Sequence, residues 1–241
     1  MFEGDKILKF ADCNQDNKQN IISCFMDKMI SLQDAASRVK SGMTLMVGGF
    51  LTSGGPNKIM DIIAESDVKD LTLICNDAAY PDKGLGKLIS NRMVKKLITS
   101  YIGSNSAAID QMNAGELEVE FSPQGTLVER IRAKGAGLGG VLTPTGLGTV
   151  VQDGKRVIEI DGKEYILEKP LNADIAFVGA SIADKMGNLY YKGTTRNFNP
   201  LVAMAGEIVI VETEEIVETG FFIPENVHTP AILVDHICNN Q

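Results

Sequence analysis

The sequence predicts an α/β fold in which helices cover a mainly parallel sheet that is interrupted by an antiparallel hairpin. The chain has 241 residues, of which 44% are hydrophobic, so one large α/β domain can fill a proper core. Short apolar runs alternate with helical patterns along most of the chain, and this alternation is typical of parallel sheets. A turn sequence flanked by β-like runs breaks the alternation at residues 155–168. We find no internal repeat, which favours a single domain.

The predicted elements begin at Ser31, where Ser31-Leu32-Gln33-Asp34 resembles a capping box with Asp in place of the usual Glu. Gly42 is expected to end this first helix. Strands are then predicted at 43–47, 71–75, 94–101, 117–121, 174–178 and 207–211. Helices are predicted at 56–65, 105–114 and 125–134, and Pro56 fits the first turn of the helix that it opens.

The hairpin is predicted from β-like runs at 156–160 and 164–167, which flank the turn sequence Asp161-Gly162-Lys163. Residues 1–25 are polar in the middle and show no sustained period, so they are expected to form a flexible N-terminal extension. The domain proper is then 26–241, and Met26 or Met29 is the candidate natural start.

The composition excludes several classes of function. A net charge of −8 and a pI near 4.9 argue against a nucleic-acid partner. No apolar run approaches the roughly 20 residues of a membrane helix, and the first 25 residues lack a secretion pattern, so we expect a cytoplasmic chain without a membrane partner. Four scattered cysteines and two histidines favour neither a disulfide framework nor a metal site, and no cofactor is indicated.

The most informative segment is Val47-Gly48-Gly49-Phe50-Leu51-Thr52-Ser53-Gly54-Gly55-Pro56, which places four glycines between a predicted strand and a predicted helix. Glycine lets the backbone adopt positive φ and approach a bound group closely. Free N–H groups at the positive end of the helix attract an oxyanion, a carboxylate or a phosphate. The alternative interpretation is a tight connector that binds nothing.

Two amide side chains are expected at the same edge of the sheet. Asn76 follows the strand at 71–75, and Gln124, with Gly125 after it, follows the strand at 117–121. Since ligands bind at the carboxyl ends of parallel strands, these amides are positioned to fix a carboxylate or an amide without adding charge. An Asx-turn for Asn76 and a helix cap for Gln124 are the alternatives.

Other constellations are weaker. The glycine-dense segment from Gly135 to Gly148 predicts a shaped loop, but it follows a helix, whereas a dinucleotide-binding fingerprint follows a strand. A packed loop crossing the sheet edge is the alternative. Glu225 and His228 share a proline-bracketed loop in which nothing fixes them toward one point, and a surface loop with a satisfied histidine is favoured over a catalytic pair. Glu129 and Arg130 are expected to form surface or subunit contacts.

Residues 26–241 resemble the α subunit of family I coenzyme A transferases, the 3-oxoacid, butyrate–acetoacetate and acetate–acetoacetate type. Four motifs in this order carry the resemblance. They are Val47-Gly48-Gly49-Phe50 with Gly54 and Pro56, Gly115-Glu116-Leu117-Glu118-Val119-Glu120 running into Pro123-Gln124-Gly125-Thr126-Leu127, Gly135-Ala136-Gly137 with Thr143-Pro144-Thr145-Gly146, and Arg196-Asn197-Phe198-Asn199-Pro200. The resemblance implies a three-layer α/β/α fold with a mixed, mainly parallel sheet, a fold related to that of sugar-phosphate isomerases.

The resemblance also implies a ping-pong reaction that moves coenzyme A (CoA) from an acyl-CoA to a short-chain carboxylic acid. The nucleophilic glutamate of this chemistry lies in the β subunit, within a Ser-Glu-Asn-Gly context that this chain lacks. Pro224-Glu225-Asn226-Val227 is the nearest approach, and the catalytic role is not carried onto Glu225. No catalytic residue is therefore expected on this chain, and an α2β2 assembly with CoA as a substrate is implied.

What the resemblance does carry over is a binding role. The implied substrate and oxyanion contacts are Gly48, Gly49, Phe50, Gly54, Gly55, Asn76, Gln124 and Gly125, with Gly135 and Gly137 in a loop near CoA. The segment Leu51-Thr52-Ser53 is more polar than is usual in the family, and this departure bears on acid specificity. Two alternatives remain: a sugar-phosphate isomerase or sensor on the related fold, which needs a cationic clamp where only Lys58 is close in sequence, and a nonenzymatic assembly subunit.

Overall fold

The computed structural model describes residues 28–240, so the expected N-terminal extension lies outside the described residues. The main sheet has the strand order β11-β10-β8-β1-β2-β3-β4, and all neighbours along this path are parallel. Strand β9 pairs antiparallel with β8, so the sheet is mixed but mainly parallel, as predicted. The strands are β1 (Thr44–Val47), β2 (Leu71–Cys75), β3 (Val94–Thr99), β4 (Glu118–Phe121), β8 (Ala173–Asp184), β9 (Leu189–Tyr190), β10 (Gly206–Val217) and β11 (His236–Asn239).

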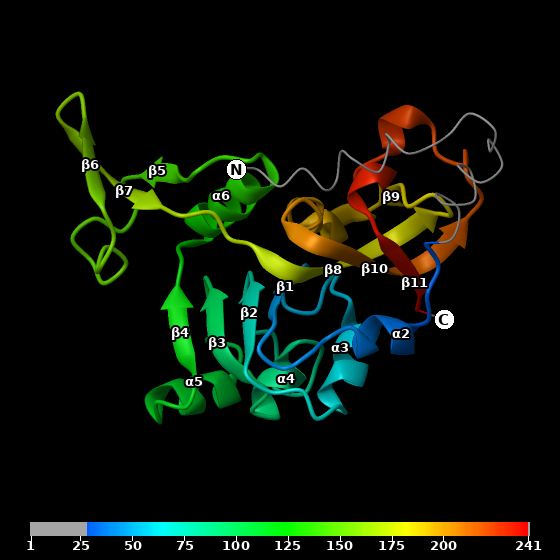
Figure 1. The fold of residues 1–241 in the computed structure, drawn as a ribbon, viewed down its shortest axis with the longest axis horizontal. Coiled ribbons are helices and arrows are strands. Elements are labelled where there is room, and N and C mark those ends of the chain that lie inside the picture. Colours follow the sequence, from blue (N-terminus) through cyan, green and yellow to red (C-terminus); the bar gives the residue numbers. More distant parts are fainter. Residues whose placement is uncertain (1–27, 241) are drawn as a thin grey trace, which may run out of the picture.

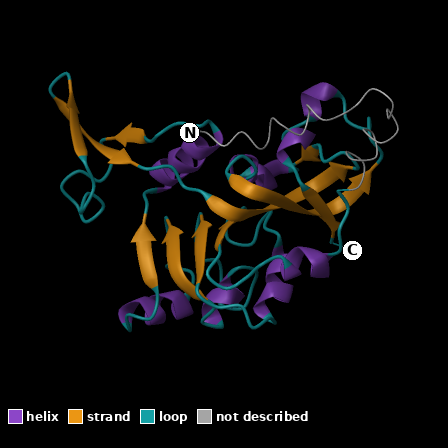
Figure 2. Cartoon of the chain, viewed as in Figure 1, coloured by secondary structure: helices purple, strands orange, loops and turns teal. Residues whose placement is uncertain are grey.

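Helices cover both faces of this sheet, which gives the three layers visible in Figures 1 and 2. One face carries α2 (Leu32–Ser37), α3 (Asn57–Ala64), α4 (Gly86–Ser90) and α5 (Ser106–Asn113), and the other carries α6 (Gln124–Gly135) and α7 (Asn199–Val202). Successive side chains of β1 enter different cores, because Leu45 and Val47 pack under α2–α5 while Met46 packs under α6 and α7. No helix within residues 28–240 has the length and apolar character needed to cross a membrane.

Most predicted elements are confirmed, with corrections at their ends. The capping box is present, since Ser31 Oγ accepts the Asp34 amide at 3.0 Å. The first helix ends at Ser37, however, and Gly42, with φ +82°, lies in the turn before β1. Pro56 is the N-cap of α3 and not part of its first turn. The elements α4, α7, β9 and β11 were not predicted, and only five residues were predicted for each of β8 and β10.

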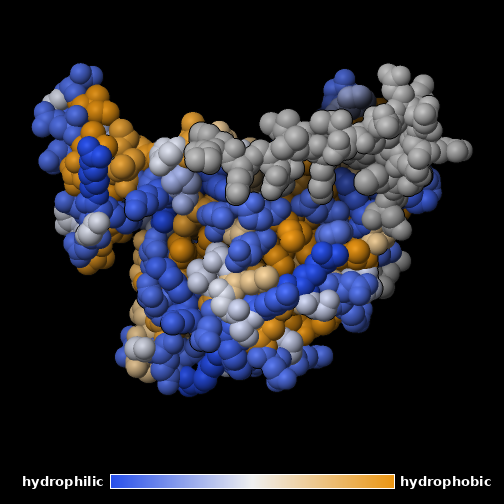
Figure 3. Space-filling view, viewed as in Figure 1, coloured by the Kyte–Doolittle hydropathy of each residue, from blue (hydrophilic) through white to orange (hydrophobic). Residues whose placement is uncertain are grey.

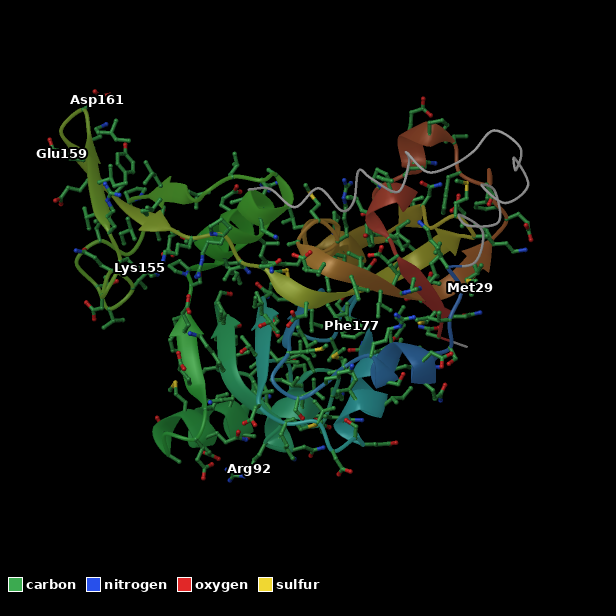
Figure 4. The ribbon with its side chains drawn as sticks, in the orientation of Figure 1. Met29, Arg92, Lys155, Glu159, Asp161 and Phe177 are labelled. Atoms are coloured by element: carbon green, nitrogen blue, oxygen red, sulfur yellow. The ribbon has the colours of Figure 1, made fainter. Side chains whose placement is uncertain are left out.

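The predicted hairpin is formed by β6 (Val157–Ile160) and β7 (Lys163–Glu168). Asp161 and Gly162 both have positive φ, which is the type I′ turn that joins two antiparallel strands. A strand that was not predicted, β5 (Val141–Thr143), pairs with β7 and makes a three-stranded sheet. This sheet, residues 141–168, is called the arm below. It projects from the main domain with Asp161 at its tip (Figures 1 and 4).

Buried charges anchor the arm to α6. Arg130 is 6% exposed, and its guanidinium donates to Glu120 at 2.8 Å and to the Lys169 carbonyl at 3.0 Å. It also lies 3.6 Å from Glu168, at the end of β7, which accepts a hydrogen bond from Lys155 at 2.7 Å. The expectation that Arg130 makes surface contacts is therefore wrong: its side chain fixes the arm from inside.

Candidate functional site

The strand order reverses between β1 and β8. From β1 the sheet grows through β2, β3 and β4 to one side, and from β8 it grows through β10 and β11 to the other. Ligands of open α/β sheets bind outside the carboxyl ends of the strands at such a point. Residues 48–55, called the glycine loop below, follow β1 at this place. The Gly48 amide donates to the carbonyl of Phe177, which Figure 4 labels near the centre of the molecule, at 2.9 Å.

The glycine loop is a compact turn whose glycines are required by its backbone. Phe50 and Ser53 exchange two backbone hydrogen bonds of 3.1 and 2.9 Å, which close the tip of the loop. Gly49 has φ +113° and Gly54 has φ +67°, and both values are strained for residues with a Cβ atom. Leu51 also has positive φ, at 53°. The sequence therefore specifies one loop shape.

Asn199 fixes the loop from the α7 side. Its fully buried side chain accepts the Gly179 amide at 3.0 Å and donates to the carbonyls of Gly54 and Thr195, each at 2.8 Å. Asn197 donates to the Ser53 carbonyl at 3.1 Å. The Arg196–Pro200 motif and the glycine loop, about 145 residues apart in sequence, therefore form one packed unit.

Several amides of the loop are left to receive a ligand. Within residues 28–240, the backbone N–H groups of Gly49, Thr52, Gly54 and Gly55 have no hydrogen-bond partner, whereas the other non-proline amides of the loop are all used. Unpaired backbone donors at the carboxyl end of a strand are suited to an oxyanion or a carboxylate. The predicted anion-binding character of the loop is consistent with this arrangement.

The helix end beside the loop is already occupied, contrary to expectation. The carboxylate of Glu212, on β10, accepts the amides of Lys58 at 3.2 Å and Ile59 at 2.8 Å in the first turn of α3. Burial raises the pKa of Glu212, and the two amide bonds oppose this effect. The positive end of α3 is thus neutralised by the chain itself, so the free donors belong to the loop and not to the helix.

The two predicted amides meet at the rim. Gln124 Nε2 donates to Asn76 Oδ1 at 2.7 Å, and Asn76 Nδ2 donates to Asp77 Oδ2 at 2.6 Å. Asp77 Oδ2 also accepts the Leu51 amide of the glycine loop at 2.8 Å. Asn76 and Asp77 are buried, whereas Gln124 is exposed as the first residue of α6. The structure therefore joins the glycine loop, Asn76 and Gln124 in one hydrogen-bonded network.

Gly125 lies in the first turn of α6, which has no side-chain cap at Pro123. A cavity of about 380 Å³ lies between this turn and β5. Its lining includes Gly125, Thr126, Glu129, Leu142 and Thr143. The start of α6 thus faces both the rim network and the base of the arm.

Gly135 and Gly137 are not brought to this rim. They lie at the other end of α6, about 18 Å along a helix of 12 residues. Gly137, with φ +69°, ends the helix in a Schellman motif, in which the Leu138 amide donates to Ala133 and the Gly137 amide donates to Lys134. A Cβ on Gly135 would crowd Met204. Helix termination and packing account for both glycines.

Glu225 and His228 do not form a pair. His228 Nδ1 accepts the Tyr191 amide at 3.1 Å, and its ring stacks on Tyr190 with centroids 4.6 Å apart. Burial lowers the pKa of His228, with a further lowering by the Arg196 charge, and the neutral ring is the form that can accept this bond. Glu225 is exposed on a short 3₁₀ turn. The structure agrees with a satisfied histidine in a surface loop.

Exposed aromatic side chains border the site, and of these only Phe50 was predicted from the sequence. One residue lies at or after the carboxyl end of each of four adjacent strands. The four residues, called the aromatic rim below, are Phe50 (46% exposed) after β1, Tyr80 (38%) after β2, Tyr101 (52%) after β3 and Phe121 (41%) at the end of β4. Hydrophobic residues also gather on the arm, at the upper left of Figure 3. Exposed aromatics grouped in this way are typical of protein interfaces.

Known proteins resemble this chain over nearly all of the described region. The sequence model of the family described as coenzyme A transferase matches residues 29–240. The chain is 54% identical over 210 residues to the acetoacetyl-CoA:acetate/butyrate CoA transferase alpha subunit of Clostridium acetobutylicum, which covers 87% of this chain and 96% of that protein. It is 50% identical to the acetate CoA-transferase subunit alpha of Escherichia coli, over 89% of this chain and 97% of that protein.

Solved structures agree on the fold. Glutaconate coenzyme A-transferase of Acidaminococcus fermentans superposes with a TM-score of 0.77 and 23% identity, over 88% of this chain and 75% of that one. The acyl-CoA transferase YdiF of Escherichia coli gives a TM-score of 0.81 and 22% identity, over 90% of this chain, which spans only 47% of the YdiF chain. The family match, the identities and the shared fold agree: the chain belongs to the coenzyme A transferase family.

Proposed function

We propose that this chain is the α subunit of a heteromeric CoA transferase that moves CoA between an acyl-CoA and a short-chain carboxylic acid. Acetoacetyl-CoA, acetyl-CoA and butyryl-CoA are the proposed donors, in keeping with the named substrates of the similar α subunits. One observation carries the proposal: the glycine loop presents four unpaired amides at the switch point of the sheet. These amides are suited to stabilise an oxyanion.

The proposed reaction is a ping-pong sequence. A glutamate of the β subunit attacks the thioester carbonyl of the acyl-CoA, the C–S bond breaks, and an acyl-glutamyl anhydride and the CoA thiolate result. The thiolate then attacks the glutamyl carbonyl, which releases the carboxylic acid as its carboxylate and leaves a glutamyl-CoA thioester. The second acid takes CoA from this thioester by the same steps in reverse. Each attack places negative charge on a carbonyl oxygen, which the loop amides of Gly49, Thr52, Gly54 and Gly55 would stabilise.

The hydrogen bonds made by the buried carboxylates of this chain support the proposal that the nucleophile lies on the partner subunit. Asp77 is the one carboxylate in the rim network, and it already accepts three N–H donors while buried. Glu212 is likewise committed to the first turn of α3. A group that is buried and hydrogen-bonded in this way is a weak nucleophile. The aromatic rim, which borders the loop, supports a partner subunit that docks over this edge and brings the glutamate.

A phosphate-binding isomerase or sensor is less well supported. Lys58, the cation expected near the loop, donates from Nζ to the Asn240 carbonyl, and its amide is bonded to Glu212. The side chain that holds the Leu51 amide of the loop is the carboxylate of Asp77, which is an acceptor and not a cation. The proposal further includes a cytoplasmic α2β2 assembly that uses CoA as a substrate without another cofactor.

Reconstitution tests the proposal. The chain is purified alone and together with a β-type chain that carries Ser-Glu-Asn-Gly, and CoA transfer from acetoacetyl-CoA to acetate and to butyrate is measured. We expect transfer only from the pair, trapping of CoA on the β chain, and loss of activity when the glutamate of the β motif is replaced by Gln. Full activity of the chain alone, or covalent attachment of CoA to it, would overturn the proposal that two chains share the active site.

The contribution of the loop is tested separately. Gly49→Val places a branched side chain at a position with φ +113°, so the loop amides are displaced. We expect the reconstituted pair to assemble but to lose most of its kcat. An unchanged kcat with intact assembly would instead support a purely structural subunit.

A further inference from the structure

The network at the rim contains one residue that neither the motifs nor the proposed reaction explains. Asp77 is 4% exposed, and its carboxylate accepts three neutral N–H donors, two from neighbouring residues and one from the glycine loop. Oδ1 accepts the Ala79 amide at 2.9 Å, and Oδ2 accepts the Leu51 amide at 2.8 Å and the Asn76 side chain at 2.6 Å. Asp77 therefore joins the turn after β2 to the glycine loop.

Asp77 sets the direction of a chain of hydrogen bonds. An ionised carboxylate only accepts, so Asn76 must turn its NH2 group toward Asp77. The Oδ1 atom of Asn76 then faces Gln124, which must donate to it, and does so from Nε2 at 2.7 Å. Ser100 Oγ lies 3.4 Å from the same Oδ1 atom. One charge therefore decides which way the amides of both Asn76 and Gln124 point.

The same oxygen of Asp77 also holds the glycine loop. Leu51 has positive φ, an unfavourable backbone conformation for a residue with a Cβ, and its amide is bonded to Asp77 Oδ2. The loop amides and the Gln124 side chain thus depend on one buried atom, although they lie more than 70 residues apart in the sequence.

We propose that Asp77 is a positioning residue, whose carboxylate holds the glycine loop through Leu51 and orients the Gln124 amide through Asn76, so that both sides of the site keep one geometry. The inference builds on the proposed CoA transfer. Asp77 does not touch the reacting atoms in this scheme. It acts through the loop and Gln124, and misplacement of such groups by a fraction of an ångström lowers the rate of the chemical step.

The first test uses the activity of the reconstituted pair. Asp77→Asn keeps the shape but replaces one acceptor by a donor, so that the Ala79 and Leu51 amides compete for one oxygen. We expect kcat to fall about 10- to 100-fold, with little change in the KM for the acid. The matched control is Asp184→Asn, since Asp184 is also buried and accepts backbone amides, in the turn at residues 186–188 away from the rim. It should lower stability but not kcat.

The second test needs no activity and no partner. Gln124→Glu replaces the donor that Asn76 requires by an acceptor, and we expect Tm of the single chain to fall by about 2–4 °C. In the Asp77→Asn background Asn76 is free to turn over, donate to the new carboxylate and accept from the new amide. There the Gln124→Glu change should cost nothing. An equal fall in Tm in both backgrounds would show that Asp77 does not orient Gln124 through Asn76.

A third variant covers the case in which Asp77→Asn does not fold. Asn76→Ala leaves Asp77 bonded to Leu51 and removes only the link to Gln124. If Asp77 acts on Gln124 through Asn76, Asn76→Ala should lower kcat, and the double variant should lose no more than Gln124→Ala alone, because Asn76 acts through Gln124. Additive losses would contradict this dependence. If the wild-type pair transfers no CoA, the proposed function fails, and the Tm cycle still decides whether Asp77 orients Gln124 through Asn76.

Discussion

The side chain of Asn199 fills the space that a side chain on Gly48 would need. A Cβ built on Gly48 would overlap Asn199 Oδ1, the atom that accepts the Gly179 amide. The close approach of backbone and amide allows Asn199 to span β1, β8 and the Gly54 carbonyl at once. Gly48 is therefore needed for packing, whereas Gly49 and Gly54 are needed for their φ angles.

Gly48→Ala is expected to displace Asn199 and to shift the glycine loop. We expect a loss of 1–3 kcal/mol in the free energy of unfolding, roughly the cost of overpacking a core, and a larger proportional loss of CoA transfer. Denaturant unfolding and kcat/KM of the reconstituted pair measure the two effects. Gly139→Ala is the control, because a Cβ there meets nothing within 4 Å. Equal behaviour of the two variants would contradict the role of Asn199.

Glu212→Ala should weaken the start of α3. The two amides that Glu212 accepts lose their partner and the helix dipole loses its nearby charge, so we expect a loss of about 1–2 kcal/mol in unfolding free energy. Glu207, on the same strand, is exposed and pairs with Lys134 at 3.2 Å. Glu207→Ala should cost less than about 1 kcal/mol. Thermal unfolding of both variants provides the comparison.

Arg130→Met should detach the arm. The substitution leaves Glu120 and the buried Glu168 without the guanidinium, and loss of one partner from a buried ion pair costs about 3–5 kcal/mol. Arg132→Met is the matched change on the same helix, since Arg132 is half-exposed and pairs with Glu129. We expect that variant to be close to wild type. Faster hydrogen exchange in residues 157–168 of Arg130→Met would locate the effect, and unchanged exchange there would argue against the anchor.

The stability of the chain should depend on pH through Glu120. Burial would raise the pKa of Glu120, but the hydrogen bond and the charge of Arg130, with those of Lys96, outweigh burial and hold the pKa below its ordinary value of 4.5. A carboxyl whose folded-state pKa is depressed contributes stability that is complete above the unfolded pKa and is lost as the pH falls through the folded pKa.

Glu120→Gln should therefore lower the unfolding free energy at pH 7 and reduce its decline below pH 4.5. Urea unfolding between pH 3 and pH 7 measures both effects. Glu118→Gln is the control, because Glu118 is largely exposed and pairs with Lys96. If the unfolding free energy of Glu120→Gln falls at acid pH as much as that of the wild type, other groups cause the decline.

The sequence was sufficient for the elements whose signals are local. The capping box at Ser31, the apolar strands β1 and β2 and the type I′ turn at Asp161-Gly162 are each encoded by neighbouring residues, and all are confirmed. The second halves of β8 and β10 were missed because small residues and charges replace the apolar run there. The two strands pair with each other at ten positions along their whole length, and this pairing keeps the second halves extended.

The site was predicted in part for the same reason. Strand ends placed Asn76 and Gln124 at one rim, and the glycine pattern placed the loop there. Asp77, Asn199 and Glu212 act through contacts that span 26, 145 and 153 residues, and no local pattern reports such distances. An acidic residue directly after Asn76 and the Asn-Phe-Asn motif were the available signals for the first two.

The arm ends in two strands whose outer edges have no partner within residues 28–240. Unpaired edges are templates on which one chain can recruit another into a growing aggregate. Both edges are short, since β5 has three residues and β6 has four, and β6 carries the exposed Glu159 near its end. The arm thus offers little length for the addition of a strand from another chain, although it extends away from the domain.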